Sequence, residues 1–156
     1  MANIPELLMT SIRTVVWGAV SAATVALACV GASAAGNPVA DRQAAMKGVG
    51  QGMKDASSVL GTFDAAKAKA SMLSVAANAK KAKGLFPAGS DKDPKTEADP
   101  KIWANKADFD KRLTELSALA TAASKADTAD TFKPAFQKVG ASCKSCHDVY
   151  RMKKKA

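Results

Sequence analysis

The amino-acid sequence predicts an all-α protein, an antiparallel bundle of four helices within one domain. Large apolar residues recur at steps of three and four positions in four segments, which is the period of an amphipathic helix and not of a strand. Glycine and proline residues punctuate the ends of these segments. The chain has 156 residues, a length that suits a single domain. Helices of about 20 residues with mostly short connections favour an up-and-down bundle.

The first helix is expected over residues 38–60. Asn37 can cap its amino end, Pro38 suits the first helical position, and Gly61 can end it. Arg42 lies in line with the apolar residues, where a charge is costly unless an opposite charge meets it or the side chain reaches solvent. The whole stripe consists of Arg42, Met46, Val49, Met53, Ala56 and Leu60.

Three glycines interrupt this first helix. Gly48, Gly50 and Gly52 each cost the helix up to about 1 kcal/mol relative to alanine. Their presence predicts that something flat and bulky packs closely against this part of the helix.

The second helix is expected over residues 64–83. Alanine and lysine dominate it, and only Met72, Leu73 and Val75 are large and apolar, so its contact face must be shallow. Residues 85–99 follow as a loop marked by prolines and glycine. Connections in bundles usually have about 2 to 8 residues, so this longer loop is expected to cover something.

The third helix is expected to begin at Pro100, with Asp99 as its cap. Its apolar residues repeat at heptad spacing and are expected in the core, with Trp103 beside them. This stripe consists of Ile102, Lys106, Phe109, Leu113, Leu116, Ala120 and Ala123.

The fourth helix is expected over residues 131–153, with Pro134 in the first turn, where a helix tolerates proline. His147 lies beside the apolar stripe of this helix. The two cysteines of the stripe and this imidazole are therefore expected to point into the bundle. The stripe consists of Phe132, Phe136, Val139, Cys143, Cys146 and Tyr150.

The sequence Cys143-Lys144-Ser145-Cys146-His147 is the attachment signature of a c-type haem. Two thiols three positions apart share one face of a helix, where each sulfur can add to a vinyl group of the haem. The adjacent imidazole can bind the iron. The predicted cofactor is therefore one covalently attached haem c.

Two other readings of this motif are disfavoured. A structural zinc site needs a second pair of cysteine or histidine ligands, and His147 is the only histidine of the chain. A thioredoxin-like redox pair would need a preceding strand, which the helical pattern does not provide.

Residues 1–35 are expected to be a cleaved signal peptide, and residues 36–156 the mature domain. Arg13 precedes an apolar run over residues 15–30, and small residues then offer cleavage sites at 32–36. The protein is therefore expected in the periplasm.

Some alternatives for this leader stay open. Translation could begin at Met9, and an apolar stretch over residues 15–35 is near the roughly 20 residues that span a bilayer. A lipoprotein site at Cys29 is disfavoured because Ala26 stands where a larger aliphatic residue is expected. Cys29 is therefore expected to leave with the leader.

The chain is basic, with 23 lysine and arginine residues against 14 aspartate and glutamate residues and a net charge of +9. Removal of residues 1–35 leaves this balance unchanged. Export argues against nucleic acid as a partner, and a solvated soluble surface explains the charge without any partner. The functional alternative is steering toward an acidic redox partner, helped by Lys144, Arg151 and the lysines that follow.

The mature chain resembles the cytochrome c′ family, the class II cytochromes c. The resemblance implies the four-helix architecture with haem on the last helix, for which this family is a standard example. Class I cytochromes c carry the haem motif near the amino terminus and resemble the chain less. The residues that carry the likeness are Val139 to His147 with Tyr150-Arg151, Arg42-Gln43 with Met46-Lys47, and Pro100 to Trp103.

The resemblance implies a role for each matching residue. Cys143 and Cys146 would form the thioether bonds, and His147 would bind the iron on the proximal side. Arg42 and Gln43 would approach the haem, with a haem propionate as the opposite charge for the arginine. The remaining matches are Glu97 as a loop acid near a propionate, Arg151 beside the proximal histidine, and Met46 over the distal face.

Met46 decides between two functions that the family combines. A methionine ligand would close the sixth position of iron and give a low-spin electron carrier, which the residues around Leu85 and Trp103 favour. A methionine that only fills space would leave five-coordinate iron open to nitric oxide or carbon monoxide. Peroxidase activity is a weaker third option because a distal histidine is lacking. We therefore expect an electron carrier and not an enzyme, soluble after cleavage, either monomeric or homodimeric.

Overall fold

The computed structural model describes residues 36–153, which form five helices within one compact unit. The expected signal peptide and Cys29 lie outside the described residues. Among the described helices, none is both long enough and apolar enough to cross a membrane. In chain order, the helices are α1 (Pro38–Ser57), α2 (Ala65–Lys83), α3 (Lys101–Ala104), α4 (Lys106–Ala123) and α5 (Ala129–Tyr150).

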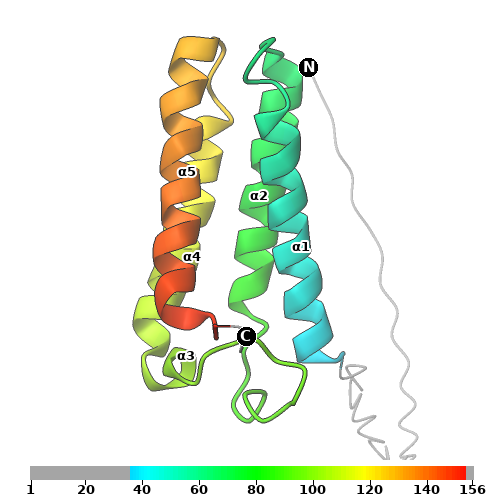
Figure 1. Cartoon of the computed structure of the whole chain (residues 1–156), viewed down its shortest axis with the longest axis vertical. Coiled ribbons are helices and arrows are strands. Elements are labelled where there is room, and N and C mark those ends of the chain that lie inside the picture. Colours follow the sequence, from blue (N-terminus) through cyan, green and yellow to red (C-terminus); the bar gives the residue numbers. More distant parts are fainter. Residues whose placement is uncertain (1–35, 154–156) are drawn as a thin grey trace, which may run out of the picture. The chain divides into compact units, whose positions relative to one another are not determined.

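The four long helices form the predicted antiparallel bundle, with successive helices running in opposite directions (Figure 1). α1 packs on α2, α2 on α4, and α4 on α5. α1 and α5, by contrast, are not among the helix pairs that pack extensively along their backbones. The first and last helices of the bundle therefore face each other mainly through side chains.

Local chemistry sets most helix ends where the sequence predicts them. The side chain of Asn37 accepts hydrogen bonds from two backbone amides at the start of α1, and Asp64 caps α2 in the same way. α1 nevertheless ends at Ser57, three residues before the predicted end. Leu60 consequently lies beyond the helix and is 39% exposed, so its assignment to the apolar stripe is wrong.

The bounds of the last helix also differ from the prediction. Thr128 caps α5 through a capping box with Thr131, so α5 starts two residues early and Pro134 falls in its second turn. α5 ends at Tyr150 because Arg151 is extended and pairs as an isolated β-bridge with Ala98.

The predicted third helix is interrupted at Asn105, whose φ of −134° and ψ of 55° are not helical. α3 begins at Lys101, so Pro100 and not Asp99 is its cap residue, although Asp99 accepts a hydrogen bond from the backbone amide of Lys101. α3 contributes the buried Ile102 to the core, and the indole of Trp103 donates a hydrogen bond to the carbonyl of Pro87. The break separates this loop-contacting turn from the long core helix α4.

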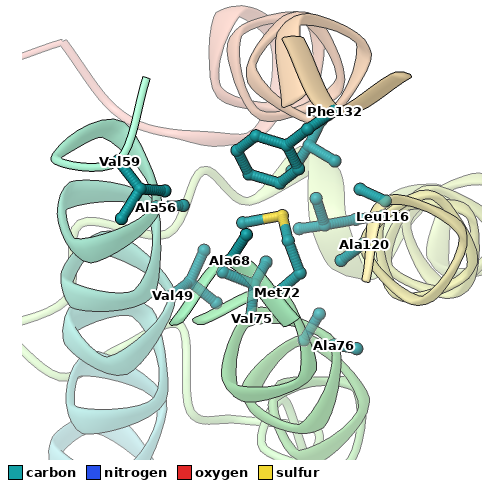
Figure 2. Packing of buried hydrophobic residues seen from close by; sticks show 13 residues of the cluster. Val49, Ala56, Val59, Ala68, Met72, Val75, Ala76, Leu116, Ala120 and Phe132 are labelled. Carbon is teal, nitrogen blue, oxygen red and sulfur yellow. The ribbon is translucent and has the colours of Figure 1, made fainter. Parts of the chain in front are cut away.

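The core has two clusters of apolar side chains. In the first, the Met72 cluster, the Met72 side chain extends beneath the ring of Phe132 and fills the space between α2, α4 and α5 (Figure 2). The second, the Phe109 cluster, comprises Ala45, Ala82, Phe86, Ile102, Phe109, Leu113 and Tyr150. Two partly buried residues of functional interest, Met46 and Cys146, pack against the Phe109 cluster.

Gly48 and Gly52 of α1 are in contact with α2, and not with the flat group that the sequence predicts. A Cβ atom at Gly52 would lie 2.7 Å from Cγ2 of Val75 and 3.0 Å from the carbonyl oxygen of Ser71. A Cβ at Gly48 would meet the side chain of Asn78, whereas one at Gly50 would meet nothing within 4 Å. The shallow face predicted for α2 is confirmed, and it allows the two helices to approach closely.

Replacement of Gly52 by alanine should destabilise the protein. The new methyl group would press on a backbone carbonyl that cannot rotate away, and overpacking of this kind costs about 1–3 kcal/mol. Gly50→Ala is the matched control, because it gains about 0.5–1 kcal/mol of helix propensity without a clash. Urea unfolding of both variants measures the difference, and equal stability would show that α1 and α2 do not pack this closely.

Candidate haem site

The two thiols of the haem motif lie on the inner side of α5. At about 100° per residue, Cys143 and Cys146 are separated by roughly 60° around the helix axis. Both are half-buried and neither forms a disulfide bond, with Cys143 against the Met72 cluster and Cys146 against the Phe109 cluster. Burial raises the pKa of both thiols, and Arg112 opposes this rise at Cys146.

The sequence predicts that His147 points into the bundle with the cysteines, and the structure shows the residue exposed to solvent. At about 100° per residue, His147 lies roughly 40° around the helix axis from Cys143, on the side away from Cys146. Surrounding protein atoms still displace water from the ring and lower its pKa. Arg151 lowers this pKa further, and Asp148 raises it. A neutral imidazole at neutral pH is the form that binds iron.

Met46 lies level with His147 on the opposite helix. The terminal methyl of Met53 on α1 is 4.0 Å from the position that a Cβ on Gly140 of α5 would occupy. α1 and α5 run in opposite directions (Figure 1). Seven residues back from Met53 along α1 and seven residues forward from Gly140 along α5 therefore cover the same distance, toward the end of the bundle where α1 begins and α5 ends. These steps lead to Met46 and His147.

The residues between α1 and α5 suit a flat apolar group with two reactive attachment points. Cys146 and Met46 pack against one apolar cluster, while Cys143 and Met53 pack against the other. Within residues 36–153, no group of three or more histidine, cysteine, aspartate or glutamate side chains could hold a metal ion by itself. The donor set therefore fits a haem held by thioether bonds, and not a metal bound by the protein alone.

Arg42 is buried, with 3% of its surface exposed, so the alternative that it extends to solvent is wrong. Its two terminal nitrogens donate four hydrogen bonds to oxygens of the loop between α2 and α3. The guanidinium also lies 5.1 Å from the ring centre of Phe86. Burial lowers the pKa of Arg42, while Asp93 and Asp91 raise it. The bonds are to the carbonyl of Leu85 (3.4 Å), to Oγ (2.9 Å) and the carbonyl (2.8 Å) of Ser90, and to Oγ1 of Thr96 (2.5 Å).

Gln43 and Glu97 contact the same loop and the end of α5. The amide nitrogen of Gln43 donates to the carbonyl of Lys95 at 2.9 Å. The carboxylate of Glu97 forms an ion pair with Arg151, with 2.5 Å between Oε2 and the nearer terminal nitrogen. The backbone amide of Met152 also donates to the carbonyl of Glu97. A haem propionate as partner for Arg42, Gln43 or Glu97 stays a prediction.

A network of polar side chains beside Cys146 was not predicted from the sequence. Asp108 Oδ2 accepts hydrogen bonds from Nε of Arg112 and from the hydroxyl of Tyr150, each at 2.7 Å. The pKa of Asp108 is lowered by the bond from Tyr150 first and then by the bond from Arg112. The spacing of Asp108 and Arg112 could have indicated their ion pair. Nothing local could indicate Tyr150, which is 42 positions away.

Comparison with known proteins gives one consistent result. A family model described as cytochrome c′ matches residues 37–151. A cytochrome c′ from Rhodopseudomonas palustris is 40% identical over 121 residues, which are 74% of this chain and 82% of that protein. A cytochrome c-556 from Agrobacterium fabrum is 34% identical over 131 residues, 81% of this chain and 88% of that protein. The solved structure of a cytochrome c′ from Rhodopseudomonas palustris superimposes with a TM-score of 0.72 at 37% identity, covering 76% of this chain and 98% of that one.

Replacement of Arg42 by methionine should loosen the loop at residues 84–100. The loop oxygens would lose their buried donors, at about 1–3 kcal/mol for each acceptor left unsatisfied. Gln43→Ala is the control, because it removes one exposed hydrogen bond and should change stability by no more than about 0.5 kcal/mol. Limited proteolysis of the loop and urea unfolding measure both effects. Equal cleavage rates in the two variants would contradict the role of Arg42.

Haem should stay on the unfolded chain during denaturing electrophoresis and stain in the gel. Because each thioether bond is covalent, Cys143→Ala or Cys146→Ala should weaken the staining, and the double replacement should abolish it. Cys29→Ala is the matched control, since this cysteine is expected to leave with the leader. Loss of haem from the unfolded wild-type chain would contradict covalent attachment.

Proposed function

The chain belongs to the cytochrome c′ family, and on this premise we propose that it carries single electrons between redox proteins in the periplasm. Its cofactor is one covalently attached haem c. We assign the thioether bonds to Cys143 and Cys146, and His147 and Met46 are the residues that would bind the iron. When bound, the haem supplies one-electron chemistry.

The position of Met46 is the observation that supports this proposal. Met46 is level with His147 on the facing helix, and it packs against the same apolar cluster as Cys146. A thioether is a soft ligand that favours ferrous iron and raises the reduction potential. An iron with both axial positions filled by protein changes little on electron transfer, which suits a carrier.

The residues around the site have supporting roles in this proposal. The Met72 and Phe109 clusters exclude water from the inner side of the two cysteines, which limits solvent reorganisation. The pairing of residues 97–99 with residues 150–152 fixes the carboxyl end of α5, which carries His147, to the loop before α3. This pairing restricts the movement of the helix that carries the iron ligand.

The positive surface supports a negatively charged redox partner. The chain has a net charge of +9, and Lys144 and Lys153 lie near His147. Lys144 is paired with Asp148 at 2.6 Å, so its charge is partly offset locally. The long-range field of the net charge can still increase the rate of encounter with an acidic protein.

The alternative function is the binding of nitric oxide or carbon monoxide by five-coordinate iron. Met46 is only partly buried, and an unbranched thioether side chain can fill space without binding the metal. Met53, which reaches toward α5 one turn before the haem motif, shows that a methionine on this face of α1 can act as filler. The state of the sixth position therefore separates the two functions.

Oxidised wild-type protein should have a low-spin absorption spectrum with the weak far-red methionine-to-iron band. Met46→Ala should remove this band, open the iron to carbon monoxide and lower the potential by on the order of 0.1 V, within the roughly 0.8 V that axial ligands control. Met53→Ala, on the same face of α1, is the matched control and should keep the band. A high-spin wild-type spectrum with prompt carbon monoxide binding, unchanged in Met46→Ala, would support gas binding instead.

A further inference from the structure

Tyr150 is the only tyrosine of the chain, and its hydroxyl group is hydrogen-bonded to a carboxylate. The residue is 4% exposed, and its hydroxyl donates to Oδ2 of Asp108 at 2.7 Å. The edge of Phe109 approaches its ring, with 5.3 Å between the ring centres. A buried phenol is thus held in contact with a group that can accept its proton.

The phenol lies one helical turn from Cys146, the second thioether position that we assign. Residues four apart on a helix lie on the same face, and both side chains pack in the Phe109 cluster. Arg112 connects the two, because its guanidinium lies 5.7 Å from the ring centre of Tyr150 and acts electrostatically on the Cys146 thiol. The phenol is therefore separated from a haem on Cys146 by a single helical turn.

We propose that Tyr150 gives one electron to the haem after the haem has been oxidised by hydrogen peroxide, and that Asp108 takes the phenolic proton. This inference depends on covalent haem at Cys146 and on access of peroxide to the iron, which a methionine ligand at Met46 would restrict. The phenol would act as a protective electron source that keeps the oxidising equivalent away from the haem ring.

Hydrogen peroxide is the oxidant in this step. With two electrons from the haem centre and two protons from solvent, its O–O bond would break to give two waters, and the haem centre would be short of two electrons. One electron then passes from Tyr150 to the haem centre. The phenolic O–H bond breaks, and its proton moves to Oδ2 of Asp108. The products are a neutral tyrosyl radical, a protonated Asp108 and a haem centre short of one electron.

The charges around the phenol favour joint loss of the electron and the proton. A phenol that has lost an electron is a much stronger acid than a carboxylic acid, so the Asp108 carboxylate accepts the proton readily. The Arg112 guanidinium beside the ring opposes a positively charged phenol radical. Arg112 also donates to the same carboxylate oxygen and holds it toward the hydroxyl.

Freeze-quenched samples treated with hydrogen peroxide should contain a tyrosyl radical, detected by electron paramagnetic resonance. Since the chain has a single tyrosine, ring-deuterated tyrosine should collapse the hyperfine pattern and assign the radical to Tyr150. Tyr150→Phe should abolish the radical, and its haem absorbance should bleach several-fold faster in peroxide. Mass spectrometry of the treated wild type should locate oxidation products on Tyr150.

Asp108→Asn tests the proton acceptor, because an amide can accept the hydrogen bond but is a much weaker base. It should lower the radical yield several-fold. Asp110→Asn is the matched control on the same helix, where the carboxylate pairs with Lys106 and not with a tyrosine, and its yield should match wild type. Equal yields in the two variants would overturn the role of Asp108.

All measurements are made in wild type and in the Met46→Ala background, in which peroxide reaches the iron even if methionine normally closes it. Failure of Met46 ligation would leave the tyrosyl radical present in both backgrounds. A haem that reacts with peroxide without forming the radical, or a haem that does not react in either background, would overturn the role of Tyr150. A signal that persists in Tyr150→Phe would overturn it as well.

Discussion

The close packing of α1 on α2 is the constraint on which the rest of the structure depends. Gly48 and Gly52 have no side chains, so α1 can approach a face of α2 built largely from small residues. This packing occupies one side of α1 and leaves the flank with Met46 and Met53 directed toward α5. The direction of the side chains that meet α5 thus depends on an interface on another side of the helix.

Buried charge organises the end of the bundle where the haem helix terminates. Arg42 is surrounded by neutral oxygens from one loop, which satisfy its terminal nitrogens and tie α1 to the connection between α2 and α3. The same loop then reaches α5 through the Glu97–Arg151 ion pair and two backbone hydrogen bonds. The long loop, which the sequence predicts to cover something, thus covers Arg42 and connects α1 to the carboxyl end of α5.

The site separates apolar and polar functions on α5. The inner face presents Cys143 and Cys146 to the core, where the low dielectric favours a buried macrocycle over free thiolates. His147 is exposed to solvent, and Tyr150, about one turn further along α5, donates a hydrogen bond to Asp108. The proposed carrier function and the proposed protective role of the phenol use neighbouring turns of one helix, and both depend on haem attached at Cys146.

The sequence by itself determined the helical class, the small-residue face of α2, the cap at Asn37 and the haem motif, because each depends on residues that are close along the chain. Only the tertiary structure decided the contacts between distant residues. α2, and not a cofactor, packs against Gly48 and Gly52 of α1. Oxygens of the loop between α2 and α3 surround Arg42, and the hydroxyl of Tyr150 donates a hydrogen bond to Asp108. The physical reason is that spacing along one helix specifies which residues share a face. What a buried charge or a missing side chain meets depends on how separate helices pack.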